Sequence, residues 1–204
     1  MNPLNSIAGT IVAGVILAII LILVTMGDHV ASAMPVNSIM IWLHVLAGIT
    51  WIGLLYYFNF VQVPALAQAA SDTGGPGGAG ITKYVAPRAL LWFRWAAVVT
   101  WLSGAAFLLH RGQLDDALAL GMLTDPIDPY ALTIGMGAWL GTIMLFNVWA
   151  LIWPNQKKIL GLVEAGPEEI AKAKRTALLA SRTNTMLSIP MIMCMVGAGH
   201  GFFM

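Results

Sequence analysis

Five long apolar stretches constrain this chain more than any other feature of its sequence. They lie at about residues 8–26, 36–61, 88–110, 131–153 and 185–204. A helix needs roughly 20 mostly apolar residues to cross the hydrocarbon core of a bilayer. We therefore predict an all-α integral membrane protein in which residues 1–204 form a single membrane domain, a bundle of five transmembrane helices.

The scarcity of charge supports this interpretation and excludes other classes of protein. Only 9% of the 204 residues are charged and 59% are hydrophobic, whereas a soluble domain carries about 25% charged residues. Disordered chains combine low hydrophobicity with high charge. We therefore expect membrane lipid around the protein. The net charge is +1 and no basic stripe occurs, so we expect no nucleic-acid partner.

The first apolar stretch also has features of a cleaved signal peptide, because Ala31, Ser32 and Ala33 fit a small-x-small cleavage site. However, no Lys or Arg precedes Ile7, and the apolar run is longer than the usual core of a signal peptide. We interpret it as a retained membrane span.

Lysine and arginine are sorted between the predicted loops. Lys83, Arg88 and Arg94 lie between the second and third stretches or early in the third. The loop after the fourth stretch is also basic, and its residues are Lys157, Lys158, Lys172, Lys174, Arg175 and Arg182. The loop after the third stretch is acidic, with Asp115, Asp116, Asp125 and Asp128 against Arg111. The positive-inside rule then places the amino terminus in the cytoplasm and the carboxyl terminus in the periplasm.

Three histidines near the predicted outer surface are the main candidates for chemistry. His44 lies inside the second stretch, His110 ends the third, and His200 is in the last turn of the fifth. An ionisable group within a span is costly and is a functional candidate by default. His29, in the first loop, is on the same side, but we do not predict a role for it.

Two histidines on different helices at similar depth are what a six-coordinate haem b requires. We predict His44 and His200 as ligands of the haem iron and His110 as a further candidate. Gly48, one turn from His44, would leave space for the macrocycle, and Trp51 continues the same face. The alternatives stay open: an intramembrane histidine often only bonds a neighbouring helix, and a histidine beside Arg111 is often a solvated helix end.

Other clusters have simpler explanations. The sulfur side chains of Met191, Met193, Cys194 and Met195 are typical of copper(I) sites but also of ordinary core packing, which we favour. Gly137 and Gly141 form a GxxxG pattern that predicts close helix packing. Four polar residues near the inner ends of their spans could form a polar network or ligand pocket: Asn59, Asn147, Arg182 and Asn184.

Several blocks carry a resemblance to a known family. They are residues 42–53 (WLHVLAGITWIG), 56–64 (YYFNFVQVP), 83–88 (KYVAPR), 137–141 (GAWLG), 153–158 (WPNQKK) and 180–190 (ASRTNTMLSIP). Together they resemble the membrane domain of bacterial cytochrome-c-linked urate oxidases of the urate hydroxylase type.

The resemblance implies a redox membrane domain of purine degradation in the bacterial inner membrane, coupled to cytochrome c. Family members carry a cytochrome c domain after the last span, but this sequence holds no CxxCH motif, and its single cysteine is Cys194. We therefore expect a separate periplasmic cytochrome c or a respiratory complex as partner. A urate oxidase-like activity is expected only together with that partner, and the substrate stays open.

Two alternatives to this function remain. The chain could be a non-catalytic helical accessory subunit of a larger respiratory complex. Whether its glycine-rich faces meet within one chain or between the chains of a homo-oligomer stays open with either function. A transporter or copper-handling protein is disfavoured, because no span carries acidic residues or an internal repeat.

Overall fold

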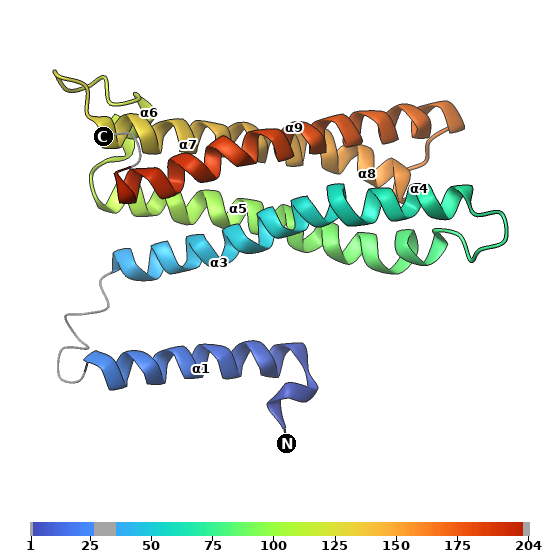
Figure 1. Ribbon diagram of the computed structural model, residues 1–204, viewed down its shortest axis with the longest axis horizontal. Helices are drawn as coiled ribbons and strands as arrows, with labels where there is room; N and C mark the ends of the chain where they lie inside the picture. Colours follow the sequence, from blue (N-terminus) through green and yellow to red (C-terminus); the bar gives the residue numbers. More distant parts are fainter. Residues whose placement is uncertain (1, 27–35, 202–204) are drawn as a thin grey trace. The chain divides into compact units, whose positions relative to one another are not determined.

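Helices make up most of the protein. The computed structural model describes residues 2–26 and 36–201, and no strand occurs in these ranges (Figure 1). The chain divides into two compact units, residues 1–39 and 40–204. The all-helical fold predicted from the apolar stretches is confirmed. His29 lies outside the described residues.

The first unit contains one apolar helix. A short turn, η1 (Pro3–Asn5), precedes α1 (Ile7–Met26). No residue between Ile7 and Val24 is buried. A helix that is apolar all round and has no core of its own must face lipid or another protein surface.

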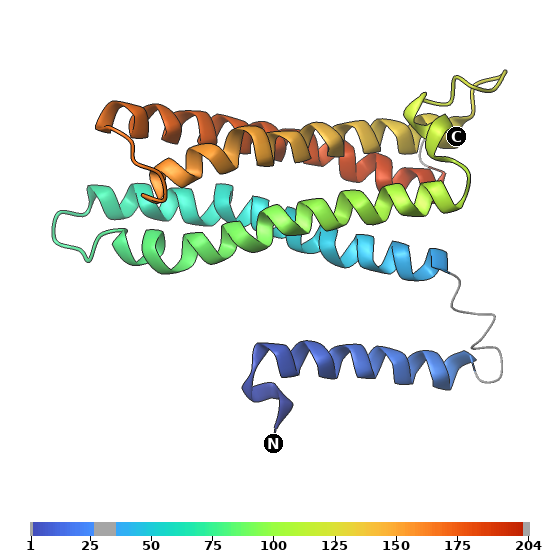
Figure 2. The same cartoon turned by 180° about the vertical axis from the view of Figure 1, so that it is seen from behind.

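Four long helical rods form the second unit, and only the first turn of α3, residues 36–39, is counted with the first unit. The first rod is α3 (Val36–Tyr57), η3 (Phe58–Gln62) and α4 (Val63–Ser71), and the second is η4 (Ile81–Val85) and α5 (Ala86–His110). After the short α6 (Leu114–Leu118), the third rod is α7 (Pro129–Phe146), η5 (Asn147–Ile152) and α8 (Trp153–Ile159). The fourth rod is α9 (Pro167–His200). The rods run along a common direction and alternate in polarity (Figures 1 and 2).

Four stretches are long and apolar enough to cross a membrane. Within the described part of the chain they are Ile7–Val24, Val36–Ser71, Ile81–His110 and Pro129–Ile159. The first four predicted spans fall within or nearly within these helical rods, although the helices from residues 36 and 129 continue beyond their predicted inner ends. The membrane character of the chain is therefore supported.

The fifth predicted span has a different structure from the one expected. The proline and two glutamates that follow Gly166 predict a short cytoplasmic helix over Gly166–Lys174 that leads into this span. In the structure the two form one helix, since α9 is continuous from Pro167 to His200. Its 34 residues are about 51 Å long at 1.5 Å per residue. Because a bilayer core is about 30 Å thick, only part of α9 could be embedded. A span over 185–204 stays a prediction, and residues 202–204 lie outside the described ranges.

Three π-helical segments interrupt the rods, and each ends two residues before a proline. The segments η3, η4 and η5 end at Gln62, Val85 and Ile152, and the prolines are Pro64, Pro87 and Pro154. Proline has no N–H to donate, and its ring collides with the carbonyl four residues earlier. That carbonyl lies inside the π segment in all three cases, so the wider i→i+5 turn accommodates the proline without ending the rod.

The helices α7 and α9 pack closely against each other at a glycine. A Cβ atom on Gly137 would lie 3.1 Å from Cys194 Cβ and 3.0 Å from Met195 Cε. Gly141, one turn on, is also buried but has no neighbour within 4 Å of the same position. The GxxxG prediction of a close-packed face is thus confirmed, with Gly137 as the residue that makes the close approach.

We expect Gly137→Ala to be less stable than Gly141→Ala by about 1–3 kcal/mol, because both gain helix propensity but only the methyl group at position 137 would press α7 away from α9. The matched change Gly141→Ala should leave stability unchanged or raise it slightly, since its methyl group meets nothing. Thermal unfolding of both variants in detergent checks this. Equal melting temperatures for the two variants would contradict the packing described.

Candidate functional site

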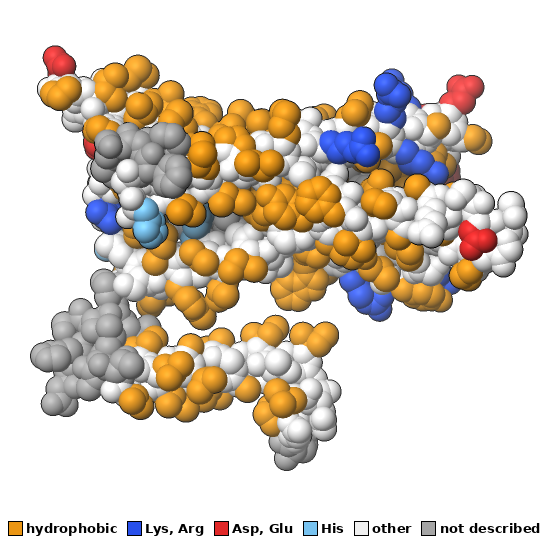
Figure 3. Space-filling model, viewed as in Figure 1, with side chains coloured by type: hydrophobic (Ala, Val, Ile, Leu, Met, Phe, Trp, Pro, Cys, Tyr) orange, Lys and Arg blue, Asp and Glu red, His pale blue; other side chains and the backbone are white. Residues whose placement is uncertain are grey.

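The histidines of the second unit lie toward the same end of the bundle. α3 begins there, and α5 and α9 end there at His110 and His200. Histidine side chains are visible near this end in Figure 3, whereas most visible lysines and arginines lie toward the other. We call the first end of the bundle the histidine end (His44, His110, His200) and the opposite end the lysine end (Lys83, Lys157, Lys158, Lys172, Lys174).

His44 is held between α3 and α5. Its Nδ1 lies 2.8 Å from the carbonyl oxygen of Thr100. A carbonyl can only accept, so Nδ1 carries the proton and donates it. Nε2 then has a free lone pair, and it makes no hydrogen bond with any other residue that the structure describes. A histidine ligand is typically oriented by this type of bond between its second nitrogen and the backbone.

Gly104 provides the space for the His44 ring. A Cβ atom at Gly104 would lie 2.8 Å from both Cε1 and Nδ1 of His44, too close for any real contact. A Cβ at Gly48 would instead meet the Thr100 methyl group at an ordinary 3.7 Å. Gly48 therefore faces α5, and Gly104 makes the close approach to the imidazole.

The remaining predicted residues at this end have different surroundings. Trp51 is 2% exposed and packs in the hydrophobic core, and its indole N–H has no partner among the described residues. His200 is exposed, and its Nδ1 donates to the Val196 carbonyl of its own helix over 2.9 Å. His110 is exposed at the end of α5. The structure records no direct contact between the three histidines.

A buried polar network crosses the middle of the bundle. Asn147 donates to Asn184 Oδ1 over 2.8 Å, and Asn184 donates to the carbonyl of Met144 over 2.9 Å. Nearer the lysine end, Asn59 donates to Ser181 Oγ over 2.8 Å. Three of the four polar residues singled out in the sequence thus join helices, whereas Arg182 is exposed.

A polar side chain is also hydrogen-bonded to the backbone just before each π segment. The carbonyl three residues before each segment accepts a side-chain donor: Leu55 from Asn59, Gly78 from Thr82, and Met144 from Asn184. Backbone bonding changes from i→i+4 to i→i+5 at these points, so an extra donor stabilises the transition.

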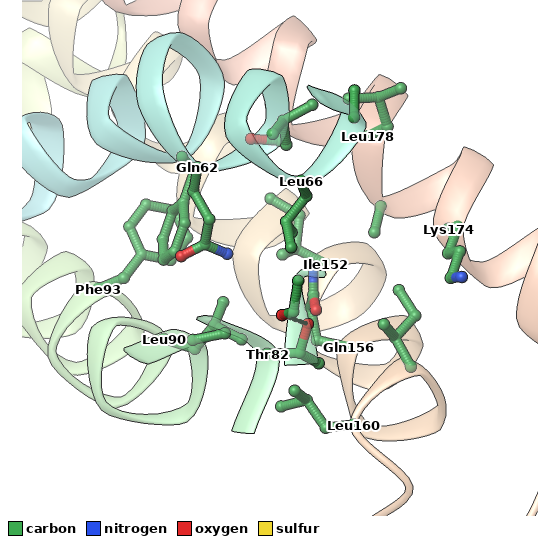
Figure 4. A pocket seen from close by; sticks show the side chains of 18 of the residues that line it. Gln62, Leu66, Thr82, Leu90, Phe93, Ile152, Gln156, Leu160, Lys174 and Leu178 are labelled. Carbon is green, nitrogen blue, oxygen red and sulfur yellow. Dashed lines mark hydrogen bonds between the residues drawn. The ribbon is translucent and has the colours of Figure 1, made fainter. Parts of the chain in front are cut away.

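A pocket of about 520 Å³ opens among the rods near the lysine end (Figure 4). η3 and α4 line one side, and η4, α5, η5, α8 and α9 supply the rest. Gln62, Thr82 and Gln156 are among its polar residues, and the sequence alone did not point to them. Gln62 lies two residues before a proline and Thr82 lies five residues before one. Their position shortly before a proline is the signal that could have identified them.

Thr100 and Gly104, the partners of His44, were not predicted from the sequence. Their spacing on α5 repeats that of His44 and Gly48 on α3. A polar residue and a glycine one helical turn apart on two neighbouring spans could have indicated that the two faces meet.

The sulfur-rich segment of α9 is divided between core and surface. Met191 and Cys194 are 7% and 4% exposed, whereas Met193 is 43% exposed. Buried sulfur side chains here fill the contact with α7, as expected for core packing.

Comparison with known proteins identifies a family. A family model described as urate oxidase N-terminal matches residues 31–120 and 121–204. No curated protein and no solved structure matches the chain.

Proposed function

The chain belongs to the urate oxidase N-terminal family, and on that premise we propose that it is a membrane redox subunit. It passes electrons from a reduced small molecule, with urate as the first candidate, to a separate periplasmic cytochrome c. We further propose that it holds a haem b near its histidine end and lies in the bacterial inner membrane with five spans. Its amino terminus is in the cytoplasm and its carboxyl terminus in the periplasm.

The observation that carries this proposal is the state of His44. The half-buried imidazole has one nitrogen fixed by the Thr100 carbonyl and the other without a partner. The second nitrogen is not among the buried atoms that lack a partner, so it is accessible at the surface of the bundle to a bound group. The donor chemistry therefore suits a residue that would hold a haem iron, with Thr100 orienting the ring and Gly104 making room for it.

His200 has the same donor chemistry and is our proposed second ligand. Its Nδ1 donates to a backbone carbonyl, which leaves Nε2 as the nitrogen available to a metal. When bound, haem b supplies one-electron transfer between ferric and ferrous iron. Because His200 is exposed at the end of α9, the histidine end is where a soluble cytochrome c would approach.

Haem content of single variants tests the proposal. Under haem-replete expression, His44→Ala and His200→Ala are each expected to reduce bound haem to a small fraction of the wild-type level. His110→Ala is the matched control and should retain haem, since His110, unlike His44 and His200, makes no orienting hydrogen bond with the residues that the structure describes. Wild-type haem content in His44→Ala would contradict the assignment of His44.

A second candidate function is supported by α1. Its apolar surface is unburied from Ile7 to Val24, which also suits a non-catalytic accessory subunit that packs into a larger respiratory complex. Co-purification with such a complex at fixed stoichiometry, without haem on this chain, would favour the accessory role over the redox role.

A further inference from the structure

The pocket near the lysine end is separate from the residues proposed to hold haem. It lies where the π segments and their prolines occur, and Phe58, Leu90 and Ile152 line its inner part. Phe58 and Phe93 meet edge to face, with ring centroids 5.4 Å apart. Its volume of about 520 Å³ is within the range typical of small-molecule sites.

Gln62 is the polar group that most needs a partner in this pocket. It is only 8% exposed, and its Oε1 is fully buried without a hydrogen bond among the described residues. The amide projects from its helix into the region between Leu90, Phe93 and Leu66 (Figure 4). A buried, unpaired acceptor is unfavourable, so a donor from a bound molecule or an ordered water would stabilise it.

The residues that line the pocket carry no negative charge that would bind a cationic ligand. None of its lining residues is acidic, and the cation among them is Lys174, which is exposed. Lys174 lies on the opposite side of the pocket from Phe93 (Figure 4). The site therefore suits an uncharged molecule, or one whose negative charge stays at the rim.

The balance of polar and apolar groups narrows the ligand further. Five lining residues have polar side chains, Gln62, Thr82, Gln156, Lys174 and Ser181, and the other 14 are apolar or glycine. Thr82 and Ser181 already use their hydroxyl groups in hydrogen bonds. A molecule polar around its whole edge, such as urate, would leave several groups unpaired here, which costs binding free energy.

We propose that this pocket binds the ring of a quinone or quinol. Such a ring is flat and largely apolar, and it is polar only at two opposite oxygens. The Gln62 amide suits both forms, because its NH₂ can donate to a quinone carbonyl and its Oε1 can accept from a quinol hydroxyl. The aromatic and aliphatic walls would cover the ring faces, and Gln156 or Lys174 could reach the second oxygen.

Binding of decylubiquinone to the full chain in lipid nanodiscs, measured by calorimetry, tests the inference. Gln62→Leu is expected to weaken binding at least about tenfold, the effect of one lost hydrogen bond to a buried group. Gln68→Leu is the matched control, since Gln68 lies on the same rod, is exposed and does not line the pocket. Its affinity should equal that of the wild type.

A second variant tests the pocket without touching the amide. Ala67 lines the pocket yet is exposed, so Ala67→Phe should fold and should block binding by filling space. The inference is overturned if decylubiquinone does not bind the wild type, or if it binds Gln62→Leu and Ala67→Phe as tightly. It is also overturned if urate binds and decylubiquinone does not.

Quinone binding is expected to be independent of haem binding. His44→Ala should bind decylubiquinone with wild-type affinity, because His44 does not line the pocket. Loss of haem with retained quinone binding, or the reverse, therefore separates failure of one proposal from failure of the other.

Discussion

Replacing Asn184 with leucine is expected to destabilise the protein by about 3 kcal/mol. Asn184 is 0% exposed, and its amide joins Asn147 on η5 to the carbonyl of Met144. Leucine is close to asparagine in size but leaves the buried side-chain amide of Asn147 unpaired, which costs about 1–3 kcal/mol. It also removes one donor from the Met144 carbonyl, which keeps its bond from the Asn147 backbone N–H, and a lost hydrogen bond costs about 1 kcal/mol. The free energy of unfolding, measured by denaturant titration in detergent, gives the size of the effect.

Asn155→Leu is the matched control for this experiment. Asn155 donates only to the Leu151 carbonyl of its own rod, and that bond is exposed. We expect a change of roughly 0.5 kcal/mol or less, as for most surface substitutions. If the two leucine variants were equally stable, the Asn147–Asn184 pair would not hold η5 against α9 as described.

Replacing Gly104 with alanine is expected to weaken haem binding about 10- to 100-fold, the usual effect of losing the orientation of a metal ligand. The added methyl group would lie 2.8 Å from two atoms of the His44 ring. The ring must then move, and its bond to Thr100 is lost. Haem titration of the purified protein, followed by absorbance, measures the dissociation constant.

Gly53→Ala controls for the general effect of an alanine in these helices, since nothing lies within 4 Å of a Cβ at Gly53. Its haem affinity should match the wild type. Unchanged affinity in Gly104→Ala, together with a normal melting temperature, would mean that the position of the His44 ring does not matter for haem.

Much of the fold could be predicted from the sequence because it is determined by long apolar stretches of residues. The first four apolar stretches became long helices at nearly the expected starts, and the family resemblance was confirmed. Gly137 was identified by its GxxxG spacing because close helix packing requires small residues at fixed intervals. The start of α9 at Pro167 also followed from local preferences for proline and glutamate in a first helical turn.

The rest depended on contacts between helices, which one sequence does not reveal. The hydrogen bond of His44 depends on how α5 is oriented about its own axis, because this orientation places both Thr100 and Gly104 next to the imidazole. Residues of all three π segments line the pocket, and each of these segments is followed by a proline. Each proline was visible in the sequence, but the meeting of the three segments around one pocket was not. Similarly, the extension of the first rod to Ser71 could not be separated from a loop by hydrophobicity alone.

The reduced-minus-oxidised absorption spectrum of the purified full chain tests the central claim most directly. After haem-replete expression, we expect the Soret and α bands of a six-coordinate b-type cytochrome, with about one haem per chain. Folded protein that shows no such bands would contradict the claim that this chain is a haem-binding redox subunit.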